Sequence, residues 1–232
     1  MSSVERFVDD TPGQPPVRGF LHRPDAAPSD ALVLTHGAGS NCGAPLLVAM
    51  ADVFSSAGTL VLRCDLPFRQ ARPHGPPFGN GAPDRAGLRR TVEVLRELVL
   101  RESAPVRVCL GGHSYGGRQA SMLAAEDETV ANALLLLSYP LHPPNKPQQL
   151  RTAHFSKLRT PALFVHGSRD PFGSPEEMRA ALSLIPAHTG LLAIESAGHD
   201  LARGRNDVGG RVLGVWTEFV ERRHGKHGDS AH

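Results

Sequence analysis

The chain is organised around six short apolar runs that alternate with segments of helical periodicity. Each run is almost continuously apolar, which is typical of strands buried on both faces of a parallel sheet. The runs are ALVLT (31–35), TLVLRC (59–64), VRVCLG (106–111), ALLLLS (133–138), ALFVH (162–166) and GLLAI (190–194). Repeated strand–helix units favour right-handed crossovers, so the sequence predicts an α/β fold with a parallel sheet.

The segments between the runs carry the spacing of amphipathic helices. Their apolar positions include Leu88, Val92, Leu95 and Val99 in one segment, and Val208, Val212, Val215 and Phe219 in another. A third segment opens with Ser174, Pro175 and Glu177, the order of an N-cap, a first-turn proline and the third residue of a capping box. These signals predict helices on both faces of the sheet.

Composition narrows the classes of function. The 232 residues suffice for one sizeable core, and we expect an extension at 1–14, a domain at 15–222 and a flexible tail at 223–232. The formal net charge is +2 with scattered Lys and Arg, which argues against nucleic acid or a membrane surface as partner. No secretory h-region or membrane-spanning run is evident, and two of three cysteines lie in apolar runs, so we expect free thiols and a cytoplasmic location.

Two segments crowded with Pro and Gly follow strands, at 65–84 and 139–149. Loops that follow parallel strands lie at the carboxyl edge of the sheet, where ligands bind in open α/β folds. About twenty residues separate the second segment's start from the next strand, too few for a large helical lid. We therefore expect an open pocket walled by these two loops.

A glycine-flanked serine, in GHSYG (112–116), follows one strand and precedes a helix-compatible run. This is the context of the G-x-S-x-G nucleophile elbow, in which a sharp turn exposes a strained serine at a helix N-terminus. An ordinary glycine-rich turn is the competing interpretation of the motif alone. The elbow makes Ser114 the candidate nucleophile.

A serine hydroxyl needs an oriented base, and the elbow order places an acid next and a histidine last. Asp170 follows the strand ALFVH, and His199 follows the strand GLLAI. All three candidates therefore project from strand ends at one edge of the sheet. Asp200 adjoins His199 and is poorly placed to reach the Nδ1 atom of its ring, so Asp170 is the candidate acid.

The loop THGAGSN (35–41) follows another strand and predicts an oxyanion hole. We expect its donors to be the backbone amides of Ala38 and Tyr115, with His36 shaping the loop. Arg118, Arg69 and Lys146 are candidate substrate-binding residues for an anionic acyl group, although solvated surface charge is the simpler interpretation of each. No clustered Cys/His spacing indicates a metal site.

The same segments resemble the α/β-hydrolase superfamily over about residues 15–222. DLPFR (65–69), GGHSYGGRQ (111–119), SYPLHPPNKP (138–147), LRT (150–152) and HGSRDPFG (166–173) are similar to small bacterial hydrolases related to dienelactone hydrolase. That group also includes a subunit of a nuclear acetyltransferase complex with a scaffolding role. The resemblance implies a mostly parallel sheet of about eight strands without a large lid. Dienelactone hydrolase itself has cysteine in place of Ser114, so its substrate is not carried over.

These features predict a serine hydrolase that cleaves a small carboxylic ester or thioester through an acyl-enzyme on Ser114. We expect it to need no cofactor or metal, to act on a small-molecule acyl substrate, and to be a monomer or homodimer. Two alternatives stay open: an acyltransferase on the same Ser114–Asp170–His199 triad, and a non-catalytic scaffold. A scaffold has no physical need for the triad together with the oxyanion loop.

Overall fold

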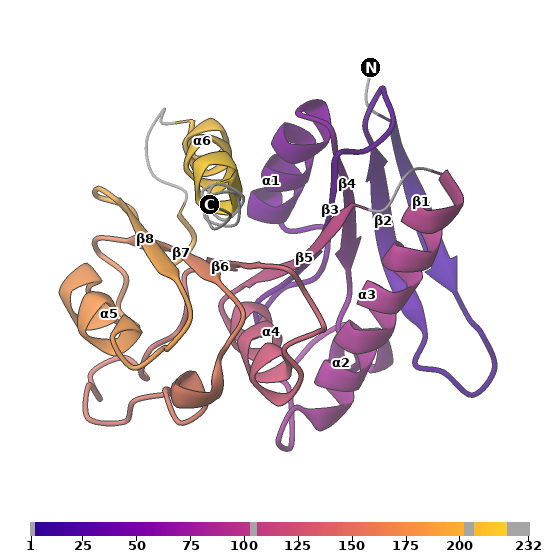
Figure 1. Ribbon diagram of the computed structural model, residues 1–232. Coiled ribbons are helices and arrows are strands. Elements are labelled where there is room, and N and C mark those ends of the chain that lie inside the picture. The colour runs from indigo at the N-terminus through magenta and orange to yellow at the C-terminus, as the bar shows by residue number, and fades with distance from the viewer. Residues whose placement is uncertain (1–2, 103–105, 202–206, 222–232) are drawn as a thin grey trace, which may run out of the picture.

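The computed structural model describes residues 3–102, 106–201 and 207–221. They form one eight-stranded sheet in the spatial order β1-β2-β4-β3-β5-β6-β7-β8 (Figure 1). The strands are β1 (Ser3–Asp9), β2 (Val17–Arg23), β3 (Asp30–Thr35), β4 (Thr59–Cys64), β5 (Arg107–His113), β6 (Leu134–Leu137), β7 (Ala162–Gly167) and β8 (Thr189–Ile194). β1–β2 and β2–β4 pair antiparallel, and the other pairs are parallel. The predicted mostly parallel sheet is confirmed.

Helices cover both faces of this sheet, as predicted. They are α1 (Pro45–Ser56), α2 (Pro67–Ala71), α3 (Ala82–Glu102), α4 (Tyr115–Glu126), α5 (Pro175–Leu182) and α6 (Val208–Glu221). In Figure 1, α1 and α6 lie on one face, and α3, α4 and α5 lie on the other. The capping box that begins α5 is present, with Ser174 and Glu177 bonding each other's backbone amides.

The alternation of side chains along β3 explains its continuous apolar run. Leu32 and Leu34 belong to the core beneath α1 and α6, whereas Ala31 and Val33 belong to the core beneath α3 and α4. All four are almost completely buried. A strand that supplies two cores has no solvent face, so it has no polar alternation.

The N-terminal part of the sheet differs from the sequence-based expectation. Residues 1–14 were expected to form an extension, yet β1 pairs with β2 along its whole length. Most β1 side chains are exposed, and Asp9 is tied to Arg90 of α3 by an ion pair of 2.9 Å. Because most side chains of this edge strand face solvent, β1 has no continuous apolar run that would have identified it in the sequence. The tail expected at 223–232 lies outside the described residues.

The connection between β6 and β7 leaves the carboxyl edge of the sheet uncovered by any large insertion. Residues 138–161 contain one short helical turn, η1 (Phe155–Lys157). The hydroxyl of Tyr139 donates to the carbonyl of Arg151 at 2.6 Å, and this hydrogen bond joins the start of the connection to its middle. A large lid is therefore absent from the described chain. No described helix combines the length and apolar character needed to cross a bilayer.

Burial lowers the pKa of several histidines, namely His22, His36, His113, His154 and His166, and brings that of His154 to about 4. Burial penalises the charged imidazoles in the folded state alone, so below about pH 6.5 the unfolded chain binds more protons than the folded chain. We therefore expect the free energy of unfolding, measured with urea, to fall between about pH 7 and about pH 5. His154→Gln should make that fall smaller, and an unchanged pH dependence in this variant would contradict the assignment.

Candidate active site

The three residues of the predicted triad meet at the carboxyl edge of the sheet. Ser114 follows β5, Asp170 lies in the loop after β7, and His199 lies in the loop after β8. These strands are parallel neighbours through β6, so their carboxyl ends lie at one edge. Residues separated by up to 85 positions in the chain thereby come into direct contact.

Ser114 sits in a backbone conformation that favours glycine, with φ 52° and ψ −116°. Its amide donates to the carbonyl of Leu137 on β6 at 2.8 Å, which fixes the turn. A Cβ atom on Gly116 would lie 2.5 Å from the carbonyl oxygen of His36, so no larger residue fits beside the serine. The sheet and the glycines together hold Ser114 in this strained position at the start of α4.

A continuous hydrogen-bond chain links the three side chains. His199 Nε2 lies 2.8 Å from Ser114 Oγ, and His199 Nδ1 lies 2.8 Å from Asp170 Oδ2. A carboxylate only accepts, so Nδ1 carries the proton and Nε2 is free to accept the serine proton. The arrangement suits an alcohol nucleophile with an oriented base.

Asp170 is held by groups that the sequence did not single out. Its side chain is completely buried, and the amide of Phe172 donates to Oδ1 at 2.9 Å. The Phe172 ring packs against the His199 ring with centroids 4.3 Å apart. On the other side of that histidine, His113 Nε2 hydrogen bonds to the backbone carbonyl of His199 at 2.8 Å. Contacts to both the ring and the backbone of His199 therefore hold this histidine in place.

The loop after β3 passes directly against the serine. A Cβ atom on Gly37 would lie 3.4 Å from Ser114 Cβ, and the amide of Gly116 donates to the carbonyl of His36. Within the described residues, no acceptor bonds the amides of Ala38 or Tyr115. His36 is completely buried; its Nδ1 bonds the carbonyl of Gly37 and its Nε2 accepts from the amide of Leu66. These bonds agree with the expectation that His36 shapes the loop.

Arg69 holds the loop after β3 in place through hydrogen bonds to its backbone. It lies on α2 and is buried, and its guanidinium donates to the carbonyls of Ala38 and Ser40 at 2.8 Å each. Further bonds run to the carbonyls of Gly75 and Arg72. A guanidinium that already bonds four backbone carbonyls suits a brace better than the substrate contact expected from the sequence.

Arg69→Lys is expected to lower kcat on an activated ester by about tenfold or more. An ammonium group cannot make the several hydrogen bonds of the planar guanidinium, so the loop that carries Ala38 loses its support. Ala38 is a predicted oxyanion donor, and losing one such donor typically costs about 10²–10³ in kcat. Arg72→Lys, a change at an exposed arginine nearby, is the matched control and should change kcat by less than about twofold. A rise in KM confined to anionic esters, with kcat unchanged, would instead favour direct substrate contact by Arg69.

The other two expected substrate residues do not gather with Arg69. Lys146 is exposed in the turns that follow β6. Arg118 lies on the first turn of α4, half-buried, and its Nε has no partner among the described residues. Burial raises the pKa of Tyr139 and lowers those of Arg151 and His154, and the Arg118 charge acts on each as a smaller, lowering effect. A substrate role for Arg118 and Lys146 stays a prediction.

Asp84 is a supporting residue that sequence reasoning missed. It is buried, accepts the Tyr115 hydroxyl at 2.7 Å, and accepts the amide of Phe68 at 3.0 Å. Burial and this carboxylate raise the pKa of Tyr115. The residue thus ties the elbow to α2 and α3. Nothing in the local sequence around Asp84 signals a contact with a residue 31 positions away.

Comparison with known proteins places the fold. A family model described as an alpha/beta hydrolase domain matches residues 28–221. A dienelactone hydrolase from Anabaena variabilis is 20% identical, with 95% of this chain and 98% of that one covered and a TM-score of 0.73. A serine hydrolase without a lid from Xanthomonas campestris is 18% identical, with 94% and 95% covered and a TM-score of 0.73. Est1E from Butyrivibrio proteoclasticus is 17% identical, with 93% and 99% covered and a TM-score of 0.72.

Proposed function

This chain belongs to the α/β-hydrolase family, and from that premise and the geometry of its site we propose that it is a serine hydrolase acting on small carboxylic esters or thioesters. The observation that carries the proposal is the unbroken chain of 2.8 Å hydrogen bonds from Asp170 through His199 to Ser114. Fold membership alone is compatible with many activities, so the side chains at the site carry the argument.

In the first step, Ser114 Oγ attacks the acyl carbonyl carbon while His199 Nε2 takes the hydroxyl proton. Asp170 holds Nδ1–H and stabilises the imidazolium that forms. The amides of Ala38 and Tyr115 are the proposed donors to the oxyanion of the tetrahedral intermediate. Tyr115 follows Ser114 directly, and Ala38 follows Gly37, where a Cβ atom would lie 3.4 Å from Ser114 Cβ. His199 then returns the proton to the leaving alcohol or thiol, and the acyl group remains on Ser114.

In the second step, water attacks the acyl-enzyme with His199 again as base, and the acid is released. The uncovered carboxyl edge of the sheet supports hydrolysis over transfer to another alcohol, because bulk water reaches the site where no large insertion covers it. A dry, lidded pocket would be needed to protect an acyl-enzyme from water.

Stopped-flow hydrolysis of p-nitrophenyl acetate tests the two-step scheme. We expect a burst of p-nitrophenol close to one equivalent of enzyme, since an acyl-enzyme that forms faster than it hydrolyses accumulates in the first turnover. The burst should vanish in Ser114→Ala. A burst that survives in this variant would move the nucleophile elsewhere, and no ester hydrolysis by folded protein would favour the scaffold alternative.

A further inference from the structure

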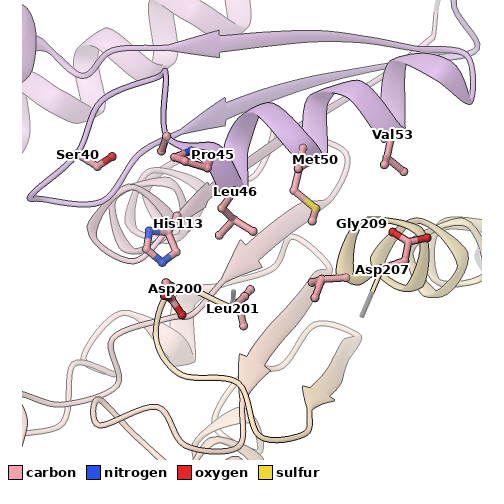
Figure 2. Close-up of a pocket in the computed structure, with 13 residues that line it drawn as sticks. Ser40, Pro45, Leu46, Met50, Val53, His113, Asp200, Leu201, Asp207 and Gly209 are labelled. Carbon is pink, nitrogen blue, oxygen red and sulfur yellow. The ribbon is translucent and has the colours of Figure 1, made fainter. Parts of the chain in front are cut away.

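A cavity of about 620 Å³ lies between α1 and the start of α6, and residues next to Ser114 and His199 in the chain line one end of it (Figure 2). Three of its lining residues neighbour the site in sequence: His113 precedes Ser114, Asp200 follows His199, and Ser40 lies in the loop of Ala38. Figure 2 shows His113 and Asp200 at one end, and Val53 and Gly209 at the other. The volume falls within the range of small-molecule sites, about 300–1,000 Å³.

The walls of the cavity are mainly apolar. Leu46, Met50 and Val53 come from one face of α1, and Leu201 faces them (Figure 2). Val208 also lines the cavity. An α-helix rises about 1.5 Å per residue, so the α1 wall from its first turn to Val53 runs about 12 Å. At the far end α1 and α6 pack closely, because a Cβ atom on Gly209 would lie only 2.9 Å from Val53 Cγ2.

Leu201 is held in an unfavourable conformation at the near end of the cavity. Its φ is 55°, a region that non-glycine residues rarely adopt, and its side chain is 1% exposed. A hydrogen bond from its amide to the carbonyl of Gly198 at 3.2 Å keeps the turn after His199 closed. The strained backbone at Leu201 thus places an apolar side chain in the cavity wall, two residues after His199.

The polar groups in the walls favour an uncharged occupant. His113 already bonds the carbonyl of His199, and burial lowers its pKa, so it is neutral near pH 7. Asp207 accepts the amide of Gly210 at 2.8 Å at the start of α6. Asp200 also lines the cavity. An anionic group placed between the mainly apolar walls would lose its hydration.

Resting on the proposed function, we propose that this cavity binds the uncharged, apolar part of the acyl group. The enzyme then prefers esters of medium-length aliphatic acids to acetates and to half-esters of dicarboxylic acids. The acyl group is the part assigned to the cavity, because it stays on Ser114 through both steps, and the cavity is lined at one end by His113, the residue before Ser114, and by Ser40 of the Ala38 loop. The alcohol leaves after the first step and needs no such site.

The test compares kcat/KM for p-nitrophenyl esters from acetate to octanoate and for the p-nitrophenyl half-ester of octanedioic acid. Each fully buried methylene contributes about 0.8 kcal/mol, which is about fourfold in kcat/KM. We expect octanoate to exceed acetate by at least about tenfold, and the half-ester to fall at least about tenfold below octanoate.

A variant that fills the cavity tests whether the preference for longer acyl chains arises there. Ala49 is an exposed residue of α1 that lines the cavity, so Ala49→Trp should lower the octanoate-to-acetate ratio of kcat/KM by at least about tenfold. Ala180→Trp on α5 is the matched control at an exposed helical alanine away from the cavity, and should leave the ratio unchanged.

The outcomes separate the two proposals. A flat acyl series, or a ratio unaffected by Ala49→Trp, with Ser114-dependent hydrolysis of acetate intact, would overturn the cavity assignment and leave the proposed function standing. A chain-length preference seen only in alkyl acetates would likewise overturn it, by assigning the cavity to the alcohol. Absence of Ser114-dependent hydrolysis of every ester would overturn both.

Discussion

Replacing Ser114 with alanine is expected to lower kcat by about 10⁴- to 10⁶-fold, the largest effect of any single substitution in this chain. The variant keeps the oxyanion donors and the oriented His199 but has no atom that can form the acyl-enzyme. Its kcat on p-nitrophenyl acetate is the measurement. Retention of more than about one per cent of the wild-type kcat would contradict the assignment of Ser114 as nucleophile.

The same substitution should change the free energy of unfolding by less than about 1.5 kcal/mol, because Ser114 contributes one side-chain hydrogen bond and no core packing. Ser114→Gly is the informative companion. At φ 52° glycine carries no steric cost, so this variant should be more stable than Ser114→Ala by roughly 1 kcal/mol while equally inactive. Urea unfolding of the two variants separates catalytic loss from structural loss.

Asp170→Asn is expected to lower kcat by about 10⁴-fold through the tautomer of His199. The amide of Phe172 donates to the Oδ1 position, so asparagine places its carbonyl there and its NH₂ group at the Oδ2 position. That NH₂ group can only donate to His199 Nδ1, which forces the ring proton onto Nε2. An Nε2–H cannot accept the proton of Ser114.

The ¹⁵N shifts of His199 distinguish this mechanism from simple unfolding. We expect the ring of His199 to carry its proton on Nδ1 in the wild type and on Nε2 in Asp170→Asn. The free energy of unfolding in urea should differ between the two proteins by no more than about 1 kcal/mol, because a buried amide replaces a buried carboxylate. A variant that keeps near-native kcat would remove Asp170 from the triad.

The parts of the fold that were predictable are those with a local chemical cause. The apolar runs that became β3–β8 are continuous because alternate side chains enter different cores, and the capping box marks the start of α5 within the chain itself. Ser114, Asp170 and His199 were predictable as candidates because each follows such a strand, and their side chains meet in the folded chain. The comparison with α/β hydrolases agrees with this architecture, whereas the scaffold relative inferred from resemblance stays a prediction.

The rest depends on contacts between distant segments, which no local pattern records. Arg69 lies in a Pro- and Gly-rich segment, and only the folded chain brings it against the Ala38 carbonyl, 31 positions away. Asp84 and Phe172 support the elbow and the acid in the same way. The apolar cavity is a further case, since it forms where residues 40–53 meet residues 200–209.

The most direct test of the account is labelling of the intact protein with a fluorophosphonate, followed by peptide mass spectrometry of wild type and Ser114→Ala. An activated serine with an oriented base attacks this probe, whereas ordinary surface serines do not. We expect one adduct per chain, on Ser114, and none in the variant. No adduct in folded wild type, or an adduct that persists in Ser114→Ala, would contradict the claim that Ser114 is the activated nucleophile.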